Sequence, residues 1–289
     1  DWGGIYLNGT SDNDGIGEFD FCVISFGGNT SGMAVSNVCF FQSNSGHFIN
    51  SGSEYSYSTG LSAADCPVDI SNSGFANNDD FAAFLDSVTI KSYPGNSAFD
   101  NGVNAFGISG TVTENMTWTD TSSVITSLVG TVTVNDDIVC TIPAGTIIKS
   151  YDDGQFSVKG TLDVNGTEVN PVIFTSMQDD DWGGDTNNDS TATSPEPGDW
   201  GGIYLNGTSD NDGIGEFIHC IIRYAGNSSG DANANISFNQ SNSASFEYSI
   251  CEYSAMHGLK ALDSPLYIDN SDFDNNEDEE HIIAINFQR

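Results

Sequence analysis

Basic residues are scarce in this sequence. Only 6 Lys and Arg stand against 41 Asp and Glu, and the formal charge is −35 at pH 7. Proteins that bind a phosphate backbone use basic side chains to displace its counterions, so this balance argues against nucleic acids and anionic membrane surfaces as partners. Long hydrophobic runs are also missing, and none approaches the ~20 residues that cross a bilayer. The sequence therefore predicts no nucleic-acid partner and no membrane insertion of this segment.

Segments with a helical period are absent as well. The composition is instead rich in Gly (32), Phe (18) and Tyr (10), with abundant Val and Ile, which favours a folded β-rich protein. Short alternating runs such as TVTV, FSVKG and PVIFTS are bounded by Gly, Asn, Asp or Pro. Such runs are typical of short strands that end in tight turns. The sequence therefore predicts an all-β chain.

The chain contains a large internal duplication. Residues 1–19 recur letter for letter at 199–217. The match continues without a gap, and it ends with 54–80 lying over 252–278. The chain is thus about one and a half units of a longer array, and we expect further residues at one or both ends.

A finer rhythm within each unit indicates stacked coils. Strands of three to five residues, with a turn every few residues, are the pattern of a solenoid. In the second copy we place Phe246 one coil before Leu266, and Tyr253 one coil before Phe273. The Asn-rich turns suit corners that need left-handed backbone geometry, where side-chain amides can stack on the next coil.

Several sequence elements resemble a known repeat family. The segment PVIFTSMQDDDWGGDTNNDSTATSPEPGDWGGIYL follows TIPAGTIIKS and KGTLDVNGTEVN, and it precedes CIIRYAGN. These GTL, PVIFTS and GDWGGI elements resemble the right-handed parallel β-helix repeats of large secreted bacterial surface proteins. The resemblance implies a pectate-lyase-like superfold and an extracellular or cell-surface location.

We therefore expect an all-β, right-handed parallel β-helix, a solenoid of roughly 12 to 14 coils at roughly 20 to 25 residues each. Its interior would consist of stacked Ile, Val, Leu and Phe side chains on alternate strand positions. We expect one continuous solenoid with three segments. These are the first copy of the block (1–93), coils that end in an Asp-rich loop (94–198), and the second copy (199–289).

The Asp-rich loop, residues 179–199, is a candidate calcium site. Asp185, Asn187 and Asp189 have the alternating oxygen spacing of calcium loops, and calcium prefers such ligands. The loop lacks the Gly and Glu of an EF-hand, and a solvated acidic turn is the alternative. A weaker candidate, with Ile where a ligand is expected, occurs in both copies: Asp12, Asp14 and Glu18, and Asp210, Asp212 and Glu216. Calcium is the only cofactor that these patterns suggest.

Three tryptophans, Trp2, Trp182 and Trp200, each precede Gly-Gly. Trp182 and Trp200 are candidates for a glycan-stacking platform, but a structural wedge at a turn between coil and loop is the favoured interpretation.

The six cysteines show neither zinc-site spacing nor a redox motif. Two interpretations stay open for them. One is disulfide pairing across neighbouring coils, such as Cys22 with Cys39 or Cys220 with Cys251, and the other is buried free thiols.

The sequence offers little for catalysis. An enzyme on this fold would cleave an acidic polysaccharide, with calcium and an Arg or Lys base or with paired carboxylic acids. Bases are scarce, and the counterpart of Arg223 in the first copy is Ser25. The acids at 179–181 could supply an acid and a base, but adjacent acids in a loop are usually solvated. No Ser-His-Asp, CxxC or HExxH grouping is present, so we predict no catalytic residues and no enzyme.

These observations favour a non-enzymatic structural or adhesive module of an extracellular fibre or cell-surface protein, with calcium as a stabilising ion. Duplicated units with identical loops suit a scaffold in which equivalent coils add length and multivalency. The expected partners are further copies of the repeat in the same chain, subunits stacked end to end, and glycans. The alternative is a β-helix protein that binds or cleaves polysaccharide.

Overall fold

A computed structural model describes residues 2–9, 14–28, 35–43, 45–118, 124–151, 154–208, 211–277 and 282–285. Across these ranges the regular elements are strands, and no helix is long and apolar enough to cross a membrane. The chain forms two compact units, which are described separately. The first comprises residues 1–110, 119–127 and 185–192, and the second comprises 111–118, 128–184 and 193–289. The predicted segments, 1–93, 94–198 and 199–289, follow the duplication in the sequence and stay a prediction.

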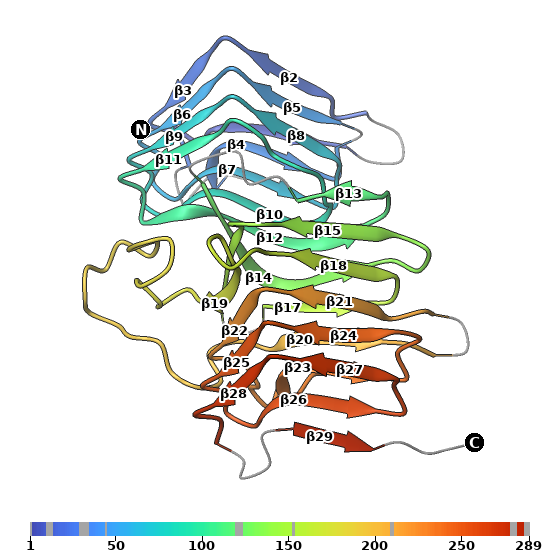
Figure 1. The fold of residues 1–289 in the computed structure, drawn as a ribbon. Helices are drawn as coiled ribbons and strands as arrows, with labels where there is room; N and C mark the ends of the chain where they lie inside the picture. Colours follow the sequence, from blue (N-terminus) through green and yellow to red (C-terminus); the bar gives the residue numbers. More distant parts are fainter. Residues whose placement is uncertain are drawn as a thin grey trace. The chain divides into compact units, whose positions relative to one another are not determined.

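The first unit contains three parallel strand stacks (Figure 1). One stack has the order β1 (Ile5–Asn8), β4 (Ser36–Phe41), β7 (Thr59–Ala64), β10 (Phe81–Thr89), β12 (Val103–Val112). The last two residues of β12 belong to the second unit. The second has β2 (Gly17–Asp20), β5 (Gly46–Ile49), β8 (Val68–Ser71). The third has β3 (Val23–Ser25), β6 (Gly52–Glu54), β9 (Gly74–Ala76), β11 (Ser97–Phe99). Because successive coils add one strand to each stack, every strand pairs with a strand from a neighbouring coil.

The second unit repeats this plan (Figure 1). One stack has β13 (Met116–Thr117), β15 (Val139–Pro143), β18 (Thr161–Asn165), β21 (Ile214–Ile218), β24 (Ala244–Glu247), β27 (Leu266–Asp269). Another has β14 (Ile125–Val134), β17 (Gln155–Val158), β20 (Gly202–Asn206), β23 (Ala234–Asn239), β26 (His257–Leu262), β29 (Ile282–Ile285). The first three residues of β14 belong to the first unit. The last has β16 (Ile147–Ser150), β19 (Val172–Ser176), β22 (Cys220–Arg223), β25 (Ile250–Glu252), β28 (Asp272–Asp274).

The register confirms the parallel β-helix and corrects its period. Where no loop intervenes, Phe246 pairs with Ile268 and Cys251 pairs with Phe273. The predicted pairs, Phe246 with Leu266 and Tyr253 with Phe273, are therefore both wrong by two residues in register. Inserted loops lengthen other coils, and Thr161 pairs with Ile214 on the far side of the Asp-rich loop. The expected 12 to 14 coils are not confirmed, because such insertions use residues without adding strands.

Alternate strand positions face the interior, as predicted. Buried and partly exposed residues alternate along β5, β8 and β24. The inward phenylalanines stack from coil to coil, with Phe48 and Phe75 centroids 5.7 Å apart and Phe217 and Phe246 centroids 6.2 Å apart. These apolar stacks exclude water from the interior and supply the main favourable free energy of folding.

Asparagines hold the corners between strands, also as predicted. Asn50, Asn72 and Asn77 all have positive φ, a conformation that Asn tolerates better than most residues. The Asn78 side-chain amide donates a 2.7 Å hydrogen bond to Asn101 Oδ1 on the next coil. Such amide stacks satisfy the buried backbone groups of a turn.

The two copies place these corners at equivalent positions. Eight non-glycine residues of the first copy that have positive φ align with second-copy residues that also have positive φ. The pairs are Phe21/His219, Phe26/Tyr224, Gln42/Gln240, Asn50/Tyr248, Tyr55/Tyr253, Asp65/Asp263, Asn72/Asn270 and Asn77/Asn275. The duplication therefore preserved the backbone at each of these corners even where the side chain changed.

Candidate functional site

Arg223 brings carboxylates together in the second unit. Its side chain is 12% exposed, and its Nη1 lies 3.6 Å from Asp179 Oδ2. Its Nε lies 3.2 Å from Glu252 Oε1, an ion pair without the alignment of a hydrogen bond. Burial raises the pKa of Glu252, and the neighbouring guanidinium acts to lower it. The cluster thus holds a largely buried cation between two carboxylates, where removal of one partner leaves an uncompensated charge.

Two tyrosine rings complete the Arg223 cluster. Arg223 Cζ lies 4.7 Å from the ring centroid of Tyr224 and 5.5 Å from that of Tyr253. Arg223 Nη2 donates a 3.0 Å hydrogen bond to the Tyr224 hydroxyl. The rings stack on each other with centroids 5.2 Å apart and an angle of 16° between their planes. A guanidinium beside such rings gains cation–π attraction in addition to its ion pairs.

Asp179 therefore has structural partners. It is almost completely buried, and its carboxylate accepts hydrogen bonds from the Thr175 hydroxyl at 2.5 Å and from the Asp181 N–H at 3.2 Å. Together with the ion pair to Arg223, these contacts anchor the start of the Asp-rich loop. The repeat pattern does not predict this cluster, because Asp179 belongs to a segment seen once in this chain.

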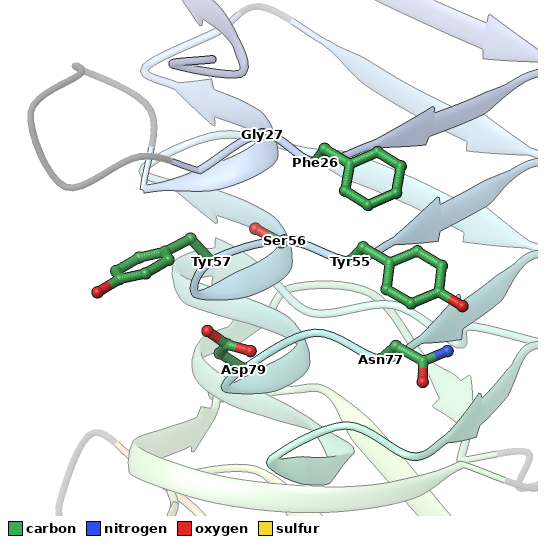
Figure 2. A pocket seen from close by; sticks show the side chains of 7 residues that line it. All are labelled: Phe26, Gly27, Tyr55, Ser56, Tyr57, Asn77 and Asp79. Carbon is green, nitrogen blue, oxygen red and sulfur yellow. The ribbon is translucent and has the colours of Figure 1, made fainter. Parts of the chain in front are cut away.

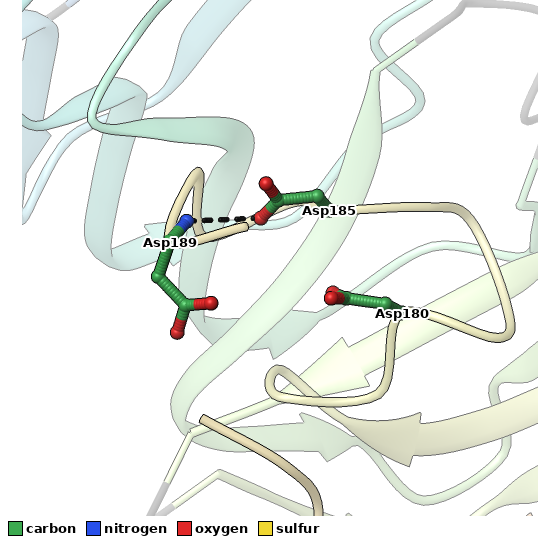
Figure 3. Close-up of side chains that lie close together, drawn as sticks. All are labelled: Asp180, Asp185 and Asp189. Atoms are coloured by element: carbon green, nitrogen blue, oxygen red, sulfur yellow. Dashed lines mark hydrogen bonds between the residues drawn. The ribbon is translucent and has the colours of Figure 1, made fainter. Parts of the chain in front are cut away.

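The strongest calcium candidate forms a self-bonded turn in the first unit. Asp185 accepts hydrogen bonds from the N–H groups of Asp189 at 3.0 Å and Ser190 at 2.8 Å. The Asn187 amide donates to Asp189 at 2.8 Å. Figure 3 draws Asp185 and Asp189 with Asp180, a residue of the second unit. These bonds define the turn and still leave carboxylate lone pairs for an ion, so calcium here stays a prediction.

The weaker calcium candidates are only partly described. Asp12 and Asp210 lie outside the described residues. Asp14 and Glu18 are exposed, and Glu216 is exposed on β21. Asp212 accepts a 2.6 Å hydrogen bond from the Asn242 amide. Within either unit, the described residues bring no three His, Cys, Asp or Glu side chains close enough to share an ion.

The prediction of Trp200 as a glycan platform was wrong. The ring is 0% exposed, and its Nε1 donates a 2.8 Å hydrogen bond to the Arg223 carbonyl. Trp2, its counterpart, donates in the same way to the Ser25 carbonyl at 2.9 Å. The favoured interpretation, a structural wedge, therefore describes Trp200. Trp182 is half-buried in the loop, and its role as a glycan contact stays a prediction.

Exposed aromatic side chains instead gather at a corner of the first copy. Phe26, Tyr55 and Tyr57 are 54%, 47% and 63% exposed, and they line a hollow of about 270 Å³ together with Asn77 and Asp79. Figure 2 shows Phe26, Tyr55 and Asn77 one above another on successive coils. This hollow was not predicted from the sequence. The available signal was that the copies align an aromatic with an aromatic at Phe26 and at Tyr55.

The six cysteines are free thiols, so the interpretation as disulfides is wrong. Five of them are buried, and Cys22 is half-buried. Burial raises the pKa of Cys140 and of Cys220 from 9.0 to about 12. The thiolate, which is the reactive and metal-binding form, is therefore disfavoured at these sites.

Comparisons with known proteins agree with this architecture. A family model described as a pectate-lyase-like β-helix domain matches residues 110–257, slightly more than half of the 289 residues. No curated protein matches the chain. No solved structure matches it either.

Proposed function

The chain belongs to the family of pectate-lyase-like β-helix domains, and from this premise we propose that it is a non-enzymatic structural or adhesive repeat module of an extracellular fibre or cell-surface protein. The observation that carries the proposal is what the duplication kept. Corner backbones, strand register and the Trp wedge recur at equivalent positions of the two copies. In both copies, for example, the first strand has the same pairing register with the next coil, as Ile5 with Val38 and Ile203 with Ile236.

The side chains that carry chemistry changed between the copies. Arg223 replaces Ser25, and His219 replaces Phe21. A catalytic site duplicated with its block would be expected to keep its acid, base and binding side chains. A scaffold needs only the corners and the core, because each added coil contributes length and a further binding surface.

A series of chains with one, two and three tandem copies of the repeating block, residues 1–198, tests this proposal. In a repeat scaffold the thermal unfolding midpoint rises as blocks are added, because each block adds interfaces with its neighbours. The same chains, incubated with neutral and acidic polysaccharides, should release no new reducing ends and no unsaturated products. Release of such products would contradict the scaffold proposal and support the alternative, a β-helix protein that cleaves polysaccharide.

A further inference from the structure

The Arg223 cluster has a counterpart in the first copy that keeps the rings and the acid but not the cation. Phe26 and Tyr55 stack with centroids 5.1 Å apart and 8° between planes, almost the same as Tyr224 and Tyr253. Glu54 lies beside Ser25 in the register of β3 and β6, as Glu252 lies beside Arg223. Of the frame that surrounds the arginine in the second copy, the two rings and one of the two carboxylates are therefore present in the first.

The two frames differ in how far they face solvent. Tyr224 is only 9% exposed, whereas its counterpart Phe26 is 54% exposed. Position 57 carries an exposed tyrosine in the first copy, and its counterpart is Ala255. The first copy thus adds a third ring and presents an open aromatic hollow. Asp79, which is exposed and also lines this hollow, provides a carboxylate on the side of Tyr57 (Figure 2).

The charge of the hollow's rim indicates the kind of group that it would hold. Asp79 lines the hollow and Glu54 directly precedes its Tyr55, so acidic groups lie at and beside the hollow, and the whole chain carries −35. Uronate and phosphate groups would therefore be repelled. A cation would be attracted, and aromatic faces add cation–π attraction. A guanidinium suits this arrangement better than an ammonium, because its plane can stack on a ring while its N–H groups reach a carboxylate.

We propose that the corner formed by Phe26, Tyr55, Tyr57, Glu54 and Asp79 binds an arginine side chain from a basic segment of a partner protein. The partner's guanidinium takes the place that Arg223 fills within its own chain in the second copy. This proposal goes beyond the scaffold function and does not depend on it, because an enzyme could carry the same surface.

The test uses the full chain and a short labelled peptide with two arginines separated by glycine. The control peptide carries citrulline, the uncharged isostere, at both positions. Binding is followed by fluorescence anisotropy at low and at physiological salt. The expected result is saturable binding of the arginine peptide that persists at physiological salt, with binding of the citrulline peptide weaker by about fivefold or more.

Variants separate the site from general attraction to an acidic chain. Tyr55→Asn keeps the charge and places at this corner the residue that Asn77 provides on the next coil, and it should weaken peptide binding about fivefold. Ser25→Arg supplies the second copy's internal cation and should weaken binding similarly. The matched controls are Tyr248→Asn, at an exposed aromatic corner of the second copy, and Ser243→Arg, at an exposed position. Both should bind like the unaltered chain.

Three results would overturn the proposal. Equal binding of the citrulline peptide would show that the hollow does not recognise a cation. Unchanged binding to Tyr55→Asn would show attraction to the acidic surface in general. Binding of a neutral glucan oligosaccharide that Tyr55→Asn abolishes, without an effect on the arginine peptide, would assign the hollow to glycans.

Discussion

Phe26 and its second-copy counterpart Tyr224 both have φ of 64°, a left-handed backbone that bulky residues rarely adopt. Each ring stacks on the aromatic ring of the next coil, with Phe26 on Tyr55 and Tyr224 on Tyr253. The corner is therefore a property of the duplicated block rather than of one side chain. At this corner the copies differ in the cation. The second copy has Arg223 beside largely buried rings, whereas the first copy has no arginine there and its rings are exposed.

Removing that cation should destabilise the second copy. Arg223→Met leaves Asp179 and Glu252 without their partner, which should cost about 3–5 kcal/mol in the free energy of unfolding. Lys91→Met is the matched control, because Lys91 pairs with Asp69 at 2.8 Å on the surface and its loss should cost under about 1 kcal/mol. Urea unfolding of both variants measures the difference, and equal losses would contradict a buried cluster.

The deficit of Arg223→Met should also depend on pH. Burial already raises the pKa of Glu252, and loss of the guanidinium should raise it further above its unfolded value. A raised carboxyl pKa favours the folded state at acidic pH and disfavours it once the group is ionised. The variant should therefore recover stability relative to the unaltered chain as pH falls below neutrality toward the unfolded pKa. A deficit that stays constant or grows on acidification would contradict this.

A buried asparagine should be essential in each copy. Asn235 accepts from the Ala225 N–H at 3.0 Å and donates to the carbonyls of Ile222 and Glu252. Asn235→Ala leaves the Ala225 N–H without its acceptor and removes one donor from each of the two carbonyls, at a cost of about 2–4 kcal/mol. Asn37→Ala should behave similarly, because Asn37 makes the equivalent bonds in the first copy. Thermal unfolding of both variants measures the loss of stability, and Asn242→Ala, at an exposed position, is the control. A fall in the unfolding midpoint no larger than that of the control would contradict a structural role for the buried asparagines.

Thiol reactivity should follow burial. A thiol reagent should label Cys22 in the folded chain, and it should reach the other five cysteines only on unfolding. Because the pKa of Cys140 and of Cys220 is raised to about 12, the unfolded chain loses their protons first. The contribution of these two buried thiols to the free energy of unfolding is complete below about pH 9 and falls as pH rises toward 12. Rapid labelling of all six thiols at neutral pH would contradict the buried assignment, and Cys22→Ser shows which signal is Cys22.

Calcium binding at the Asp-rich loop can be tested by linkage. If the loop binds the ion, added calcium should raise the unfolding midpoint, and Asp185→Asn should remove that response. The Asn side chain keeps acceptor capacity for the turn while removing the charge. Magnesium provides the control ion. No response of the unaltered chain to calcium would leave the loop as the solvated, self-bonded turn.

The repeats, the strand type and the Asn corners are predictable from the sequence, because each depends on local patterns. The pairing register of the strands is harder to predict from the sequence. The pattern places Phe246 opposite Leu266, whereas Ile268 is its partner, since a two-residue shift keeps the same face inward and leaves the pattern unchanged. The burial of Trp200 is equally hidden, because a sequence does not show which coil covers a ring.

The Arg223 cluster could not be predicted for a related reason. Its second carboxylate, Asp179, comes from an insertion, and the register of an insertion is not encoded in the repeat. The aromatic corners were missed because left-handed positions favour Gly and Asn, so a Phe or Tyr there gives no local signal. The aligned aromatic residues of the two copies, Phe26 with Tyr224 and Tyr55 with Tyr253, are the sequence signal for these corners.

Electron microscopy of the tandem series tests the central claim most directly. If the block is a unit of a β-helix scaffold, particles should lengthen by the same increment with each added block, about 4.8 Å for every coil. Their width should stay constant. Chains that grow into separate globular particles, or that gain no length with a second block, would contradict the account.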